Sequence, residues 1–559
     1  MDEESPRICS HTFTLPEYDY EGYDAESSRW LMDSSYPGVR DGAWHCPHRA
    51  VDGESMCPFH LPVDRRPEEL DETESFLEII EGRTERGVYP RHTQFVDATF
   101  TGLKLDERTI RAVDNRVIDC SHATIGGIRG EYAEFVGRFK CANGTFTGPI
   151  ECAHATFEKR VDLRGATFLD EVEFKGSTFE DYLGLKQSTF RERADFYYTT
   201  FEFYLSGGGV TFERDVRFEA AYFDYYLRLV DATFEGAVNF RLATFDDEVG
   251  LSGATFAEAG TFEEARFRRL LAIEDLTING RFELENADVD RITLEIAPDQ
   301  PADTVVSLAG SNVRAGTVRI PADGTVAVDL DRTTVGSVKF TAIDGGSVLE
   351  YVRFLRTTYD GFEFEDDDDV DPERTNWTIH TLENEDVLPR EDRIDPTPTT
   401  LRQTYLNAKN GADDVGNNTA AGAFFYRELV YRRRSHFERA RDGSLSPLRR
   451  VRALTKWARN GVLAVTAGYG ERADRVIYSS LAVIGLFAVL YSLVIQPLDQ
   501  DASVVDYTTF SAQVFVTFIV GSPPTNTSTL GEAIVVAQGF IGAFLIALFV
   551  FTFTRRVYR

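Results

Sequence analysis

The sequence is short of basic residues, of cysteine and of methionine. Its 559 residues hold 59 Lys and Arg against 91 Asp and Glu, with a formal net charge of −32, and only 6 Cys and 3 Met. A dispersed acidic excess repels nucleic-acid phosphates, so nucleic acid is not an expected partner. Six Cys in a chain of this length do not predict a disulfide scaffold.

Common catalytic motifs are missing as well. The sequence has no P-loop, no GxSxG and no HExxH, so we expect no enzyme activity. The first thirty residues are polar and acidic and do not resemble a signal peptide. The chain is too long for one hydrophobic core, which predicts several domains.

The strongest positive signal is a repeat of eleven residues. Phe occurs at every eleventh position from Phe135 to Phe267, and a second apolar series, including Leu163 and Phe174, runs five positions earlier. A helical period of 3.6 cannot hold this series on one face, whereas a solenoid can. If each coil has four sides, two units make a coil of 22 residues. Gly207 interrupts the apolar series and predicts a local irregularity.

The segment "LRGATFLDEVEFKGSTFEDYLGL" resembles the pentapeptide-repeat family. The pairing of these repeats with long apolar runs near the C-terminus resembles a set of haloarchaeal pentapeptide-repeat proteins. The resemblance implies a mainly β fold, a right-handed quadrilateral β-helix. It is strongest over residues 95–284 and continues more weakly to 354. The acidic composition is similar to that of halophilic archaeal proteins.

The N-terminal segment, residues 1–70, is rich in Cys and His. Cys9, Cys46, Cys57 and His60 could form a tetrahedral Cys3His structural zinc site, which suits a short segment with little core of its own. The alternative is that these residues are incidental members of an acidic leader. The other three cysteines, Cys120, Cys141 and Cys152, are expected to be small core residues.

Three kinds of connector are expected around the solenoid. We expect a short helical lead-in over residues 71–94 and an acidic loop region over residues 355–397. Residues 398–442 have the pattern of a helical hairpin, which acts as a stalk or as a cap on the solenoid. The following segment, 443–475, is basic: residues 427–475 contain 13 Arg and Lys against 5 Asp and Glu.

Two uncharged runs, 476–495 and 533–554, are long enough to cross a bilayer. Basic residues precede the first run and follow the second in the short tail 555–559. The positive-inside rule therefore predicts that the β-helix and the C-terminus are cytoplasmic and that 496–532 lies outside the plasma membrane. Membrane lipids are the expected partners.

Between the spans, "YTTFSAQVFVTFIVG" is apolar but too short to cross, which predicts a re-entrant segment. The layout resembles the two-transmembrane pore domain of potassium channels. Thr517, Phe518, Ile519, Val520 and Gly521 stand where such channels carry the filter Thr-Val-Gly-Tyr-Gly. Ile519 replaces the first glycine, so we expect a degenerate filter. Two spans cannot enclose a pore, which predicts a homo-oligomer, most simply a tetramer.

Two functions follow from this layout. The first is a sensing, gating or scaffolding β-helix on a degenerate cation channel. The alternative is a non-conducting membrane anchor that presents the acidic β-helix to an unknown protein partner. Some pentapeptide-repeat proteins imitate DNA, and the charge of this chain permits that role.

Overall fold

The computed structural model describes all residues except 1–6, 16–34, 84–91, 302–303, 322, 344–350, 365–376, 383–387, 389–394, 471, 495–502, 521–528 and 558–559. The described residues form two compact units. The first contains the N-terminal segment and a long β-solenoid that reaches Arg353, and the second contains the helices that follow residue 354.

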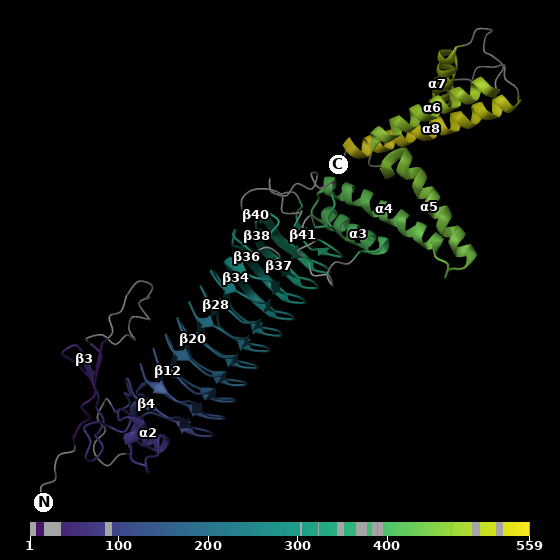
Figure 1. The fold of residues 1–559 in the computed structure, drawn as a ribbon. Coiled ribbons are helices and arrows are strands. Elements are labelled where there is room, and N and C mark those ends of the chain that lie inside the picture. The colour runs from purple at the N-terminus through teal and green to yellow at the C-terminus, as the bar shows by residue number, and fades with distance from the viewer. Residues whose placement is uncertain are drawn as a thin grey trace, which may run out of the picture. The chain divides into compact units, whose positions relative to one another are not determined.

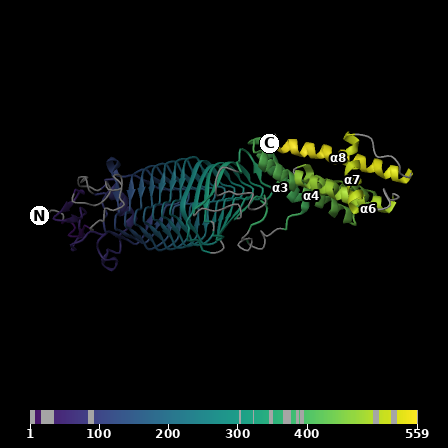
Figure 2. The same cartoon turned by 90° about the horizontal axis from the view of Figure 1, so that it is seen from above.

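The solenoid repeats every 22 residues, as the sequence predicts. A typical coil has four strands, β14 (Thr156–Phe157), β15 (Val161–Asp162), β16 (Thr167–Phe168) and β17 (Val172–Glu173). The next strand, β18 (Thr178–Phe179), pairs in parallel with β14, so that Phe157 lies beside Phe179. Figure 1 shows these coils stacked one on the next, and Figure 2 shows the same stack from a second side.

One sheet of the solenoid takes a single strand from each coil. This 12-stranded sheet runs from β5 (Leu103–Lys104) to β41 (Val352–Arg353), so eleven steps separate its first and last strands. The predicted β-helix, including its extension to about residue 354, is therefore confirmed. Its right-handed sense and four-sided cross-section stay predictions.

Stacked aromatic rings fill the inside of the coils. Phe190 is 1% exposed and stacks on Phe168 at 4.3 Å and on Phe212 at 4.7 Å between ring centroids. Parallel pairing in register brings identical side chains together in adjacent coils, which gives each ring an apolar partner above and below. The three cysteines expected in this core, Cys120, Cys141 and Cys152, are buried there.

Each eleven-residue unit turns on a residue with a positive φ angle, three positions before its core residue, which is Phe up to position 267. From Tyr132 to Asn286 every eleventh residue has this left-handed backbone; the series is Tyr132, Asn143, His154, Gly165, Gly176, Gln187, Tyr198, Gly209, Ala220, Asp231, Leu242, Gly253, Glu264, Asp275 and Asn286. At Gly253 (φ 68°) a Cβ atom would lie 2.2 Å from Oδ1 of Asp231 in the preceding coil. Any side chain at position 253 would therefore force the carboxylate of Asp231 to move.

The irregularity expected at Gly207 is absent. Leu183 pairs with Leu205, and Leu205 with Leu227, at the same 22-residue spacing as elsewhere. A Cβ atom on Gly207 would lie 2.7 Å from Cδ2 of Leu229. The larger side chain of the next coil fills the place left by the glycine, so the coil needs no loop.

The last coils change from short strands to long ones. β34 (Arg266–Ile278) pairs with β30 (Thr244–Phe245), β31 (Val249–Gly250) and β32 (Thr255–Phe256) together. The strands β36 (Asp288–Ile296), β38 (Asn312–Ile320) and β40 (Thr334–Ala342) continue this pattern. In these last coils one long strand covers sides of the coil that earlier coils build from separate two-residue strands joined by turns.

The N-terminal segment packs on the first coil. β1 (Thr12–Thr14), β3 (Ala43–His45) and β2 (Val39–Arg40) form a small antiparallel sheet. Helix α2 (Glu72–Ile80) is shorter than the lead-in expected over 71–94, and its Phe76 packs against Phe95 and Phe100.

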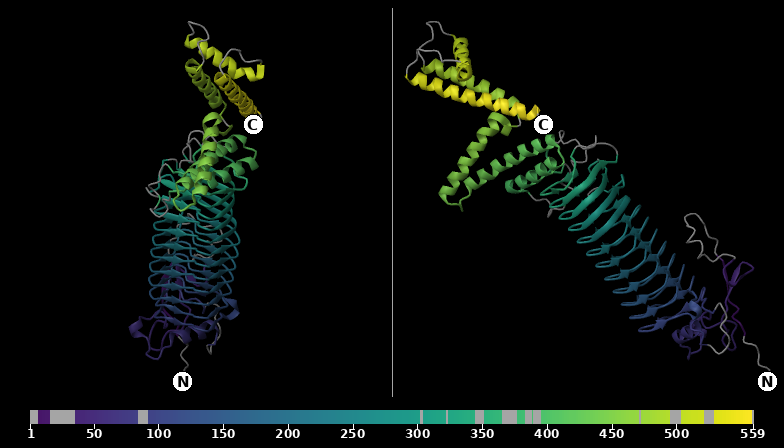
Figure 3. Two further views of the ribbon diagram at one scale, coloured as in Figure 1. Left: turned by 90° about the vertical axis from the view of Figure 1, so that its right-hand side faces the viewer. Right: turned by 180° about the vertical axis from the view of Figure 1, so that it is seen from behind.

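The second unit consists mainly of helices: α3 (Pro398–Asp414), α4 (Asn418–Arg441), α5 (Pro447–Ala467), the short η5 (Gly468–Gly470), α6 (Ala473–Val494), α7 (Val504–Val520) and α8 (Thr529–Val557). Figure 3 shows them from two further sides. Residues Ala473–Leu493 of α6 and Leu530–Thr554 of α8 are long and apolar enough to cross a membrane, as judged by length and composition. They overlap the spans predicted at 476–495 and 533–554.

Candidate functional site

The four predicted metal ligands come together in the first unit. The ligand atoms of Cys9, Cys46, Cys57 and His60 all lie within 4.8 Å of one another. The Sγ atoms of Cys46 and Cys57 are 3.8 Å apart, and Nδ1 of His60 lies 3.9 Å from Cys9 Sγ and 3.0 Å from Cys57 Sγ. The predicted cluster is confirmed.

Backbone pairing around the small sheet places the cysteines. The amide of Cys9 donates to the carbonyl of His48 at 2.9 Å, and the amide of Cys46 donates to the carbonyl of His11 at 3.1 Å. A tight turn then brings His60 back to Cys57, whose own amide donates to Cys9 Sγ at 3.2 Å.

The separation of two of the sulfur atoms fits a tetrahedral metal. A zinc ion about 2.3 Å from each sulfur requires sulfurs about 3.8 Å apart. The Cys46–Cys57 separation of 3.8 Å satisfies this requirement. All three thiols are buried, and three Cys with one His make up the four-donor set of a closed structural site.

The imidazole of His60 is oriented for metal binding. Its Nε2 lies 2.9 Å from the carbonyl oxygen of Val96 and donates its proton there, which leaves the Nδ1 lone pair directed at the thiols. His11 stacks on the same ring at 4.0 Å, and Nε2 of His11 lies 3.0 Å from Oδ2 of Asp97. The roles of Val96 and Asp97 could not be predicted, because both residues lie in the first coil, far along the chain from the cluster.

Burial opposes charge on the cysteines. The pKa of the Cys57 thiol is raised to about 12 and that of Cys46 is also raised, both mainly by burial. The pKa of Cys9 is lowered by the hydrogen bonds of Cys46 and Cys57. Three thiolates in one buried cluster require a cation for charge balance, which a divalent metal ion would supply.

The cluster lies against the open end of the solenoid. Phe59, next to the ligand His60, packs on Phe95 and Phe100, and its carbonyl accepts a 2.8 Å hydrogen bond from the amide of Thr99. A solenoid needs a cap over its terminal coil, and this segment supplies one.

A second candidate site is the helical hairpin of α6 and α8. Helix α7 packs between these two helices. Its Tyr507, Phe510 and Val514 form an apolar cluster with Ala488, Tyr491 and Val535. Further along α7, Phe515 packs with Leu545 of α8.

A buried polar network links the three helices. The Tyr491 hydroxyl donates to Oε1 of Gln538 at 2.5 Å, and Nε2 of Gln538 donates to Oγ of Ser511 at 2.7 Å. The Ser511 hydroxyl in turn donates to the carbonyl of Ile484 at 2.8 Å. All three side chains have a relative exposure of 0%. The network was not predicted, although Gln538 stands out as a polar residue within an apolar run.

The backbones of α7 and α8 also approach closely. A Cβ atom on Gly542 would lie 2.2 Å from the carbonyl oxygen of Phe515. Any other residue at position 542 would therefore push α7 away from α8.

Four of the five filter-like residues, Thr517, Phe518, Ile519 and Val520, have a helical backbone as the last residues of α7. The fifth, Gly521, lies outside the described residues. The filter assignment stays a prediction.

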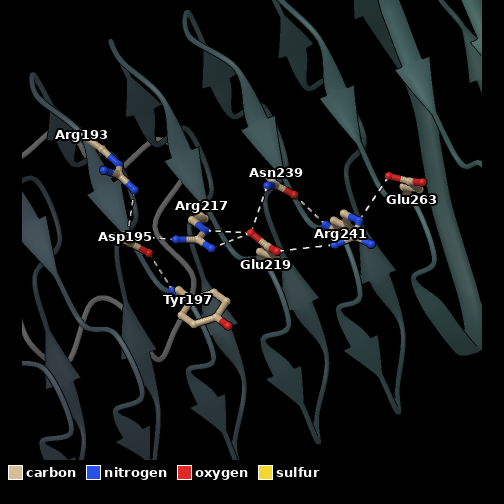
Figure 4. Close-up of polar contacts among 8 residues, drawn as sticks. All are labelled: Arg193, Asp195, Tyr197, Arg217, Glu219, Asn239, Arg241 and Glu263. Carbon is tan, nitrogen blue, oxygen red and sulfur yellow. Dashed lines mark hydrogen bonds and ion pairs between the residues drawn. The ribbon is translucent and has the colours of Figure 1, made fainter.

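The outer face of the solenoid carries two arrangements of charge. On one side, opposite charges alternate from coil to coil (Figure 4): Asp195, Arg217, Glu219, Arg241 and Glu263 are joined by ion pairs of 2.7–3.8 Å. On this side, therefore, opposite charges face one another between adjacent coils.

On another side the charges are alike. Glu158, Glu180, Glu202, Asp224 and Asp246 each follow a core Phe, and the amide of each residue from Glu180 onward donates to the Phe carbonyl of the preceding coil. Five carboxyl groups therefore form a column at one-coil spacing, which we call the acidic column. It ends where Arg268 pairs with Asp246 at 2.8 Å.

Comparison with known proteins identifies the solenoid. Residues 153–200 match the family described as pentapeptide repeats (9 copies). No curated protein and no solved structure matches the chain. The matched residues lie within the solenoid, whose coil of 22 residues continues on both sides of them, which supports a pentapeptide-repeat β-helix.

Proposed function

We propose that the chain is a membrane protein in which the β-helix senses, gates or scaffolds a cation-channel-like pore domain formed by α6, α7 and α8. The observation that carries this proposal is the depth that α7 reaches between the two candidate spans. Residues near the start of α7 contact one end of α6 and of α8, and residues further along α7 contact the middle of each of these helices.

The contacts of α7 define that depth. Near its start, Tyr507 belongs to a cluster with Tyr491, close to the end of α6, and Val535, close to the start of α8. Later residues of α7 meet Ile484 and Gly542, each near the middle of its helix. A helix that ends at mid-membrane is tolerated where protein or a water-filled cavity surrounds its end. Its C-terminal carbonyl groups carry a partial negative charge that favours cations.

The remaining elements of the proposal rest on composition and symmetry. Two spans per chain require several copies to enclose a pore, most simply four. The basic residues beside both spans favour a cytoplasmic β-helix and a cytoplasmic C-terminus in the plasma membrane. The acidic composition favours a halophilic, archaeal source.

Single-channel recording tests the pore. The purified full-length protein is reconstituted in planar bilayers in potassium chloride, and wild type is compared with Gly542→Val, which would displace α7. Gly485→Val in α6 is the matched control, because nothing lies within 4 Å of its Cβ position. We expect unitary currents in wild type and in the control and their loss in Gly542→Val. Silence from an inserted, oligomeric wild type would refute conduction.

The second candidate function is a non-conducting anchor. Two observations favour it: the helical backbone of Thr517 to Val520, in which carbonyl groups are directed along the helix rather than across a pore, and the acidic column. In this case a protein with a basic surface binds the β-helix. Silence in bilayers together with capture of a defined basic partner that charge reversal at Glu202 abolishes would support it.

We also propose that Cys9, Cys46, Cys57 and His60 hold a structural zinc ion. The set of four protein donors, of which the three thiols are buried, supports this assignment over a catalytic metal, which needs an open position. The metal would stabilise the cap of the first coil, and we propose no chemical reaction for it.

A further inference from the structure

Helix α5 leaves an apolar face uncovered. Leu448, Val451, Val462 and Val465 are 58–74% exposed, and they recur at intervals of three, eleven and three residues. At 3.6 residues per turn these intervals bring all four to one face of the helix.

The opposite face of α5 is already occupied. Its buried residues are Ala453, Ala464 and Ala467, and Ala464 packs in a cluster with Leu429 of α4. The exposed apolar face is therefore not the face by which α5 joins its own unit.

Basic residues border the exposed face. Helix α5 contains five, Arg449, Arg450, Arg452, Lys456 and Arg459, and no acidic residue. At 100° per residue, Arg452, Lys456 and Arg459 lie along one edge of the apolar face and Arg450 along the other. Without acidic residues, α5 is a uniformly basic helix in a chain with a net charge of −32. An apolar face with a basic border is typical of helices that lie in the interface of an anionic bilayer.

The position of α5 agrees with such a placement. It ends at Gly468 in a left-handed turn (φ 51°), and the candidate span α6 begins at Ala473. Figures 1 and 3 show that α5 runs across the direction of α6 and α8 instead of continuing α6. In Figure 1, α4 and the two spans lie on opposite sides of α5.

We propose that α5 lies in the plane of the membrane, with its apolar face in the acyl-chain boundary and its basic border on anionic lipid headgroups. This inference rests on the membrane location of α6 and α8 under the proposed function. The apolar face selects a lipid surface over nucleic acid or free phosphate, since neither of these would cover it. This face of α5 attaches the helical unit directly to the bilayer surface.

Quenching by brominated lipid tests the placement. The full-length protein is reconstituted in vesicles of phosphatidylglycerol and phosphatidylcholine, in a Trp457→Phe background, with one added tryptophan. Val462→Trp reports on α5, Leu486→Trp on the lipid-exposed side of α6, and Tyr198→Trp, on the solenoid surface, serves as the control; these three side chains are 59%, 66% and 66% exposed. We expect brominated lipid to quench the tryptophans at 462 and 486 but not the one at 198.

The outcomes separate this inference from the proposed function. Quenching at 486 without quenching at 462 would overturn the placement of α5 and leave the spans in the membrane. Quenching at neither position would overturn both. Substitution of Arg452, Lys456 and Arg459 by Gln should weaken the association of α5 with the anionic membrane surface about 100-fold, at roughly fivefold per charge. Quenching at 462 that is unchanged by this triple substitution and by salt would refute the role of anionic headgroups.

Discussion

The side-chain amide of Gln538 in α8 donates hydrogen bonds to both the Oγ atom and the carbonyl oxygen of Ser511 in α7, at 2.7 and 3.0 Å. Both side chains are completely buried. In an apolar environment a polar group without a partner is strongly unfavourable, so this pair fixes where α7 lies against α8. The proposed depth of α7 depends on it.

Replacement of Gln538 by Leu should loosen α7. It leaves the hydroxyl of Tyr491 without its acceptor and Ser511 without its donor, and we expect a loss of about 1–3 kcal/mol of stability. Thermal unfolding of the full-length protein in detergent measures it. Thr509→Val, which removes an exposed hydroxyl bonded within α7, is the control and should be near neutral. Equal melting of Gln538→Leu and wild type would contradict the proposed role of the network.

The N-terminal cluster should contain one zinc ion per chain. Elemental analysis by mass spectrometry of the purified protein measures it, and Cys57→Ser should lose the metal. Cys152→Ser is a matched control, because Cys152 is equally buried but lies outside the cluster. Chelation should lower the melting temperature of wild type and of Cys152→Ser but not that of Cys57→Ser. A metal content that does not change in Cys57→Ser would rule out this site.

The left-handed turns predict opposite effects at two positions. Leu242 is 42% exposed with φ 61°, a backbone that costs a branched side chain about 1 kcal/mol, so Leu242→Asn should raise the stability by up to that amount. Gly253→Ala should lower it, because the added Cβ would lie 2.2 Å from Asp231 Oδ1. Thermal unfolding followed by far-UV circular dichroism compares them. Shifts of the same sign would refute this account of the turns.

His380 should make the helical unit sensitive to acid. Nδ1 of His380 lies 2.8 Å from the Tyr405 hydroxyl, and burial, assisted by Arg427 and Arg434, lowers its pKa to about 4 from 6.5. The unfolded chain then binds a proton at higher pH than the folded chain. Stability is complete above about pH 6.5 and falls as the pH decreases towards 4, by on the order of 2–3 kcal/mol.

The comparison of wild type with His380→Gln tests this effect. Melting temperatures are measured between pH 8 and pH 4. The substitution should flatten the part of the decline that begins near the ordinary histidine pKa. An identical decline in both proteins would assign the acid sensitivity to other groups.

The acidic column predicts a requirement for salt. Its carboxyl groups repel one another at one-coil spacing, and salt screens this repulsion over about 10 Å at 0.1 M. We expect the melting temperature to rise with potassium chloride. Glu202→Lys, which places a cation between Glu180 and Asp224, should raise stability at low salt and reduce the salt dependence. A steeper dependence in that variant would contradict the repulsion.

Much of the fold could be predicted from the sequence, because it depends on repeats and apolar runs that are local patterns along the chain. The Phe series at eleven residues determines a coil of 22, since each side chain must stack on its equivalent in the next coil. The two apolar runs determine helices long enough to cross a bilayer. Residue type and the short spacing between Cys57 and His60 selected the four members of the Cys and His cluster from a segment that also contains three other His.

The tertiary structure decided the contacts between residues far apart in the chain. Ser511 and Gln538 are 27 positions apart and His11 and Asp97 are 86 apart, so no pattern along the sequence pairs them. The exposed face of α5 is likewise known only once α4 covers the opposite one. Local sequence specifies the period and the polarity of an element, whereas its partners and its uncovered faces depend on how the elements pack.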